Sequence, residues 1–105
     1  MSTEYRATLS IPASHPALPG HFPDAPVVPA VVLLDCVLQT GERWLRRPVT
    51  AFSLPQVKFH TPLLPGQPAE CVLHLDGERL HFRIARDGEL IAQGEFRCRV
   101  GDSGL

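Results

Sequence analysis

The sequence has 105 residues and a formal net charge of −1, and its composition is 44% hydrophobic and 20% charged. These values are typical of one soluble globular domain, which we expect to span residues 1–105, and they lack the strong basic charge of a nucleic-acid-binding domain. No apolar run reaches the roughly 18 residues that a membrane-spanning helix needs, and the polar N-terminus shows no signal-peptide pattern, so we expect a cytoplasmic protein.

The N-terminal part predicts a short strand followed by a proline-rich loop. Tyr5, Ala7 and Leu9 alternate with polar residues, which is the pattern of a half-buried strand. Residues 12–29 contain six of the eleven prolines, and proline fixes φ and removes a hydrogen-bond donor, so no regular element is expected there. The loop is either packed against the apolar run that follows or an ordinary long surface loop.

Residues 29–45 predict one helix. Pro29 suits the first helical turn, and the run that follows is apolar on nearly all sides, which is typical of a helix enclosed by other structure. The helix should stop before Pro48. The apolar residues 31–34 are also compatible with a buried strand, but the length of the segment and its N-terminal proline favour the helix.

Alternating apolar and polar residues predict about four further strands, around residues 57–60, 71–75, 80–84 and 90–100. Asp-Gly pairs at positions 76 and 87 are hairpin-turn signals. An antiparallel sheet with one apolar face must bury that face, and the one predicted helix is apolar all round. The pattern therefore predicts an α+β fold in which an antiparallel sheet wraps around one central apolar helix.

The cysteines and the strand histidines form no recognisable metal site. The three cysteines are odd in number and far apart, which disfavours a disulfide framework and a zinc site and fits a reducing compartment. His60, His74 and His81 fall at polar strand positions, where we expect them to face solvent without a metal.

Asp35 is the most informative polar residue of the predicted helix. Its neighbours three and four positions away are Val31, Val32, Leu38 and Gln39. A carboxylate in apolar surroundings loses solvation unless it is paired or protonated, so this position suggests a functional acid. A carboxylate at the helix edge, or one that fixes the fold by bonding a loop amide, remains an alternative.

His21 and the helix start are the other candidates for chemistry. His21 lies in a Pro-Gly-His-Phe-Pro segment, and histidine is the side chain best suited to proton transfer near neutrality, although a loop histidine is more often a surface residue. The amides of Ala30 and Val31 would have no intrahelical acceptor and would suit a developing oxyanion, a property that any helix start shares.

These features resemble the active-site motif of the bacterial 3-hydroxyacyl-[acyl-carrier-protein] dehydratases. Residues 20–35, GHFPDAPVVPAVVLLD, are similar to that family's G-H-F-x-G-x-P-hydrophobic-x-P-G followed by an apolar helix with an acid fourteen residues after the histidine. The separation here, from 21 to 35, is also fourteen, and Gln39 matches as well. Residues 57–66, VKFHTPLLPG, resemble the family's V-K-F-x-x-P-V-x-P-G.

The resemblance implies a hotdog fold and the dehydration of a 3-hydroxyacyl thioester to the trans-2-enoyl thioester. His21 would remove the C2 proton, Asp35 would hold the 3-hydroxyl and assist its departure, and the amide of Ala30 or Val31 would stabilise charge on the thioester carbonyl. It also implies substrate contacts from Gly20, Phe22, Ala30 and Val31. No metal or redox cofactor would be needed, because the acyl group arrives on phosphopantetheine.

The resemblance further implies partners. In this family the active site lies across a dimer interface, which implies a homodimer, a multiple of one, or a heterodimer with a homologue. An acidic acyl carrier protein would need a basic docking patch, for which the candidates are Arg43, Arg46, Arg47 and Lys58. Cations at a helix C-terminus also complement its dipole, which is an equally good explanation of the arginines.

Two departures from the motif leave alternatives open. Asp24 and Ala30 stand where the family has glycine, and the chain is shorter than typical members. These differences suggest a specialised branch such as the small dehydratases of aryl-polyene pathways. A hotdog acyl thioesterase and a catalytically silent dehydratase-like partner subunit are the alternatives.

Overall fold

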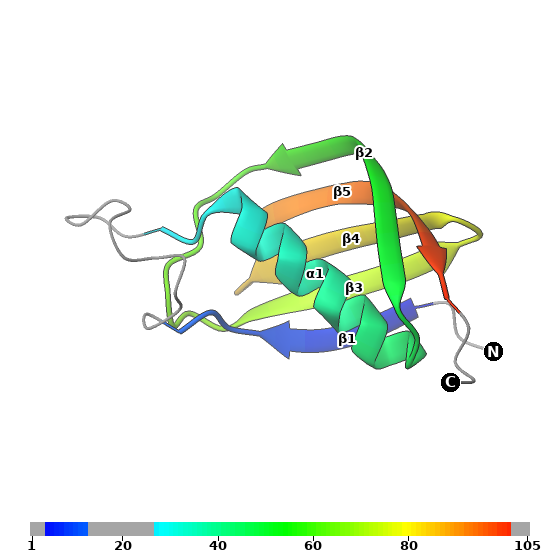
Figure 1. Ribbon diagram of the computed structural model, residues 1–105. Helices are drawn as coiled ribbons and strands as arrows, with labels where there is room; N and C mark the ends of the chain where they lie inside the picture. The colour runs from blue at the N-terminus through cyan, green and yellow to red at the C-terminus, as the bar shows by residue number, and fades with distance from the viewer. Residues whose placement is uncertain (1–3, 13–26, 102–105) are drawn as a thin grey trace.

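A computed structural model of the chain describes residues 4–12 and 27–101. Within them, six elements follow one another: β1 (Glu4–Leu9), α1 (Ala30–Leu45), β2 (Val49–Phe59), β3 (Ala69–Asp76), β4 (Arg79–Arg86) and β5 (Glu89–Val100). The strands form an antiparallel sheet in the order β1-β3-β4-β5-β2, and α1 lies across one face of it (Figure 1). This confirms the predicted α+β arrangement.

Helix α1 has the bounds that the sequence predicted, because both of its ends are set locally. Pro29 is extended, with φ −62° and ψ 148°, and its carbonyl accepts the amides of Val32 and Leu33 at 3.1 Å each. At the other end Arg46 is left-handed, with φ 55°, and its amide donates to the Glu42 carbonyl at 2.8 Å. Pro48 then prevents continuation.

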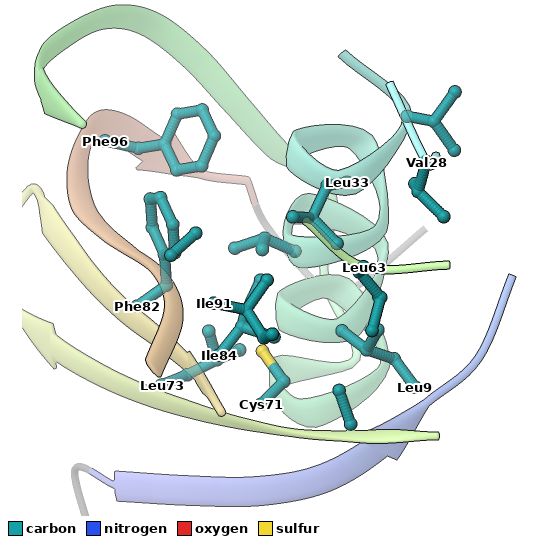
Figure 2. Close-up of a cluster of buried hydrophobic side chains, with 14 of the residues drawn as sticks. Leu9, Val28, Leu33, Leu63, Cys71, Leu73, Phe82, Ile84, Ile91 and Phe96 are labelled. Carbon is teal, nitrogen blue, oxygen red and sulfur yellow. The ribbon is translucent and has the colours of Figure 1, made fainter. Parts of the chain in front are cut away.

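The core lies between α1 and the sheet. Val37 of α1 and Leu73 and Ile84 of the sheet are each 0% exposed, and Figure 2 shows Leu73 and Ile84 among the buried side chains beside the helix. Burial of each such side chain contributes about 1.5–3 kcal/mol. The inward positions of β1, β3 and β4 are the apolar ones that the sequence predicted.

Strand β5 departs from the predicted alternation at one point. Ile84 of β4 is opposite Ala92, but the next residue, Ala85, is opposite Leu90. Ile91 is therefore an extra residue, and this bulge lets Ile91 and Ala92 both be buried although they are adjacent in sequence. The regular alternation predicted for residues 90–100 is therefore wrong at this point, because Leu90 and Ala92 do not share one face.

Strand β2 begins eight residues earlier than predicted and forms one edge of the sheet. Its pairing with β5 shifts register between Ala51 and Ser53 and again between Ser53 and Gln56, so its first half does not alternate and escaped recognition. Pro55 lies in this irregular part, where an edge strand tolerates a missing N–H. The strand leaves three large apolar side chains exposed: Phe52 at 53%, Leu54 at 38% and Phe59 at 47%.

Candidate active site

Asp35 lies on the side of α1 that faces away from the sheet. Its carboxylate accepts a hydrogen bond from Gln39 Nε2 at 2.7 Å, one helical turn further along, and both residues are exposed. The residues of α1 that are buried against the sheet are Val32, Leu33, Val37, Thr40 and Gly41. The chain thus presents an oriented carboxylate on an open helix face.

The described residues, 4–12 and 27–101, do not enclose α1 as expected. Val31, one turn before Asp35, is 72% exposed, and Leu34 and Leu38 are only partly buried. Sequence periodicity predicted apolar neighbours for Asp35 and a covered helix, but it could not show whether the cover comes from this chain or from another. An apolar helix face with a carboxylate at its centre is the kind of surface that a second subunit covers.

The start of α1 offers two amide donors. The amides of Ala30 and Val31 donate to no acceptor among the described residues, and Pro29 before them provides no side-chain cap. They lie at the positive end of the helix dipole, where a developing negative charge is stabilised. The helix start thus offers donors of the kind that the predicted oxyanion role needs, and that role stays a prediction.

An apolar hollow of about 310 Å³ lies beside this helix start. It is lined by Val27, Val28, Ala30, Leu33, Phe59, His60, Thr61, Pro62, Leu63 and Ile91. Its lining residues come from both sequence motifs, because the Val28 amide donates to the Leu63 carbonyl at 2.8 Å and so joins residues 27–28 to the 57–66 segment. The fold thus brings the two motifs together around one space that suits an alkyl chain.

The bulge in β5 holds the second motif in place. The carbonyl of the bulged Ile91 accepts the amides of His60 at 2.8 Å and Thr61 at 3.3 Å. His60 therefore lines the hollow. The sequence predicted that it faces solvent, and the residue is indeed exposed, but its place in the hollow was not predicted. Its position two residues before Pro62, inside the second motif, was the signal that could have revealed this.

Part of the predicted site lies outside the described residues. This holds for His21, the predicted base, for Gly20 and Phe22, the predicted substrate contacts, and for Asp24, which replaces a family glycine. Their roles stay predictions.

The four predicted docking cations do not form one patch within the chain. Arg43, Arg46 and Arg47 lie at the C-terminal end of α1, where Arg43 donates to Thr40 Oγ1 at 3.2 Å. Lys58 follows Val49 by nine residues along β2, which is up to about 30 Å of strand. Lys58 thus lies at the far end of β2 from the three arginines.

The cysteines offer no activated nucleophile. Burial, with a smaller contribution from Cys36, raises the pKa of Cys71 to about 12. Burial likewise raises the pKa of Cys36 and of Cys98, so all three remain thiols near neutrality. Across residues 4–12 and 27–101, no cluster of three or more His, Cys, Asp or Glu is arranged to hold a metal ion, and no helix there has the length and apolarity to cross a membrane.

Comparison with known proteins gives consistent matches. The family model described as ApeI-like, ApeI dehydratase, matches residues 1–95. The 3-hydroxyacyl-[acyl-carrier-protein] dehydratase FabZ of Protochlamydia amoebophila is 41% identical over 87 residues, covering 77% of this chain and 53% of that protein. FabZ of Rhodopseudomonas palustris is 27% identical over 109 residues, covering 89% of this chain and 71% of that protein. The chain thus spans about half the length of the first of these relatives.

Solved structures agree in fold. The dehydratase heterocomplex ApeI:P from Xenorhabdus doucetiae superimposes with a TM-score of 0.82 at 27% identity, covering 93% of this chain and 88% of that one. The fluoroacetyl-CoA thioesterase FlK gives a TM-score of 0.71 at 16% identity, covering 98% and 90%, which reflects the fold alone. These likenesses confirm the hotdog fold.

Proposed function

Because the chain belongs to the ApeI-like dehydratase family, we propose that it removes water from a 3-hydroxyacyl thioester to give the trans-2-enoyl thioester. The observation that carries this proposal is the convergence of both sequence motifs on the apolar hollow at the start of α1. An acyl chain in the hollow would place its thioester near the amides of Ala30 and Val31, which have no acceptor among the described residues. The family match and the FabZ relatives support the same reaction.

In this proposal, each step of the dehydration is assigned to a named residue of the chain. His21 takes the proton from C2, and the electron pair of the broken C–H bond forms the C2–C3 double bond. The C3–O bond breaks as the hydroxyl, held by Asp35, takes up the proton that His21 removed from C2 and leaves as water, which returns His21 to its starting state. The amide of Ala30 or Val31 stabilises the negative charge that develops on the thioester oxygen. Gly20 and Phe22 would shape the space around the reacting carbons.

The acyl group would be delivered by an acyl carrier protein on its phosphopantetheine arm, as the likeness to carrier-protein dehydratases suggests. Arg43, Arg46 and Arg47 are grouped at one end of α1 and would meet an acidic carrier. Lys58 would belong to the same surface only if a second subunit brought it there.

We infer that the working unit is a pair of hotdog subunits. The exposed face of α1 around Asp35 and the open edge of β2 both need cover, and the related ApeI:P structure is a heterocomplex. A second copy of this chain and a homologous partner are both consistent with those surfaces. Light scattering of the chain alone, and after co-expression with such a homologue, separates the two.

The reaction is tested by substituting the acid and the base. His21→Ala and Asp35→Asn should each lower kcat for a 3-hydroxyacyl thioester by roughly 10²–10⁴-fold, because each removes a group that acts on a proton or a leaving hydroxyl. The enoyl product is followed by mass spectrometry, with folding checked by circular dichroism. Asp76→Asn changes an exposed carboxylate at the end of β3, so it is the matched control and should keep full activity.

The outcome also decides between the alternatives. A folded His21→Ala or Asp35→Asn variant with wild-type kcat would refute the assigned role. Release of a free acid instead of an enoyl thioester would identify a thioesterase. A silent partner subunit is the second candidate, because the related ApeI:P structure contains two subunits. It predicts no turnover by the chain alone and undiminished turnover when both residues are replaced within an active heterocomplex.

A further inference from the structure

A second hollow, of about 470 Å³, lies on the face of the sheet opposite α1. Two adjacent cross-strand rows form most of it: His74, His81, Glu95 and Gln56 in one row, and Val72, Arg83, Gln93 and Lys58 in the next. We call it the outer hollow. The sheet itself separates it from the helix face that carries Asp35, so it belongs to a different site.

The second row places two cations on either side of an amide. Lys58 on β2 and Arg83 on β4 are both in register with Gln93 on the strand between them. Neighbouring strands are about 4.8 Å apart, so the two Cα atoms are about 10 Å apart. Long side chains on the same face can therefore close on one small anion held above Gln93.

The nearby carboxylates already lie close to other basic side chains. Glu95 lies 3.5 Å from His81 Nδ1 and 3.9 Å from Arg79 Nε, and Glu70 lies 3.2 Å from Arg6 Nη1. Among residues 4–12 and 27–101, Lys58 and Arg83 form no ion pair with any carboxylate. Glu95 is the one carboxylate that lines the outer hollow, and among the described residues it pairs with Arg79 and His81, not with Lys58 or Arg83.

We propose that the outer hollow binds a phosphomonoester. The planar guanidinium of Arg83 matches two phosphate oxygens, the Lys58 ammonium adds a point charge, and the Gln93 amide adds a neutral donor. A dianion engages both cations at once, whereas a carboxylate satisfies only one. The chemistry fits free phosphate and the phosphate group of an organic molecule alike.

The remaining space favours the organic source. Small-molecule pockets commonly measure about 300–1,000 Å³, and the volume of the outer hollow falls in this range. The hollow is therefore larger than a phosphate group alone would fill. The rings of His74 and His81 have centroids 5.9 Å apart and are tilted by 41°, so they offer flat surfaces in the neighbouring row. A phosphomonoester with a planar organic group would fill both rows.

Binding is measured by following backbone amide NMR signals while inorganic phosphate, adenosine monophosphate or acetate is added at constant ionic strength. We expect saturable shifts at Arg83, Gln93 and Lys58 with both phosphates and none with acetate. Lys58→Gln and Arg83→Gln should each weaken phosphate binding by at least about fivefold, because each removes a charge-assisted hydrogen bond. Tighter binding of the nucleotide, lost in His81→Ala, identifies an organic phosphate, and equal binding identifies free phosphate.

Arg99→Gln is the matched control. Arg99 is another exposed arginine of the sheet, but it has a carboxylate partner in Glu78, 3.6 Å away. Its substitution should leave the affinity unchanged. The absence of saturable binding, or equal weakening by all three glutamine variants, would overturn the proposal. The readout is binding alone, so it is independent of whether the chain is a dehydratase.

Discussion

The hydrogen bond from Gln39 to Asp35, 2.7 Å long, gives the exposed carboxylate one orientation on α1. We expect Gln39→Ala to lower kcat about two- to tenfold with little change in KM, because loss of one hydrogen bond costs roughly 0.5–1.5 kcal/mol in the transition state. Gln39→Glu, similar in size but repelling the carboxylate, should lower kcat further. Steady-state kinetics on purified variants check this, and a change confined to KM would contradict a positioning role.

The buried Cys71 thiol predicts how stability depends on alkaline pH. Its pKa of about 12 in the folded chain lies above the ordinary value of 9.0, so between these values the folded state holds a proton that the unfolded state has lost. Stability therefore falls as pH rises above about 9, by at most ~1.4 kcal/mol per pH unit from this group. Cys71→Ala should flatten that decline.

Urea unfolding of the wild type and of Cys71→Ala between pH 8 and about 10.5 measures this dependence. The comparison uses slopes, because the substitution also leaves a cavity that lowers stability at every pH. Identical slopes for the two proteins would show that Cys71 does not titrate as described.

At the scale of the elements, Gly94 shows why β2 can run so close to β5. A Cβ atom there would lie 2.5 Å from the Gln56 carbonyl oxygen and 2.9 Å from the Val57 Cα and from Phe82. We expect Gly94→Ala to lower the free energy of unfolding by at least about 1–3 kcal/mol, because the backbone of β2 at Gln56 and Val57 must move away. Chemical denaturation measures the loss.

Gly41→Ala is the control for that substitution. It adds the same methyl group inside α1, where the nearest atom, Leu80 Cδ2, would be at an ordinary 3.4 Å. It should be neutral or stabilise by up to about 1 kcal/mol, since alanine favours the helix. Equal losses at both positions would mean that the close crossing of β2 is not the cause.

The helices and strands also differ in how well the sequence predicted them. The ends of α1 and the inward positions of β1, β3 and β4 were predictable, because proline, hairpin turns and regular alternation act locally. The first half of β2 and the bulge at Ile91 were not, because their irregular pairing has no periodic signature. Asp35 was found through its apolar helical neighbours and its spacing from His21, but whether a second subunit covers its helix face cannot be read from the periodicity of one chain.

At the scale of the whole molecule, pairing of subunits should depend on the open edge of β2. Leu54→Lys should weaken self-association or association with a homologue, because a charge on an edge strand opposes pairing with another strand. Light scattering over a concentration series measures the change. Leu64→Lys is the control, because this leucine is also exposed, at 43%, but lies outside β2. Unchanged assembly in Leu54→Lys would place the interface elsewhere.

Pro55 gives this edge a property that matters before any partner arrives. A freshly synthesised chain displays an edge strand with exposed Phe52 and Leu54, which is a template for uncontrolled stacking into cross-β aggregates. A proline in the middle of that stretch removes one backbone donor and interrupts any continuous ladder. We therefore expect Pro55 to lower the tendency of an unpaired chain to aggregate through the edge of β2.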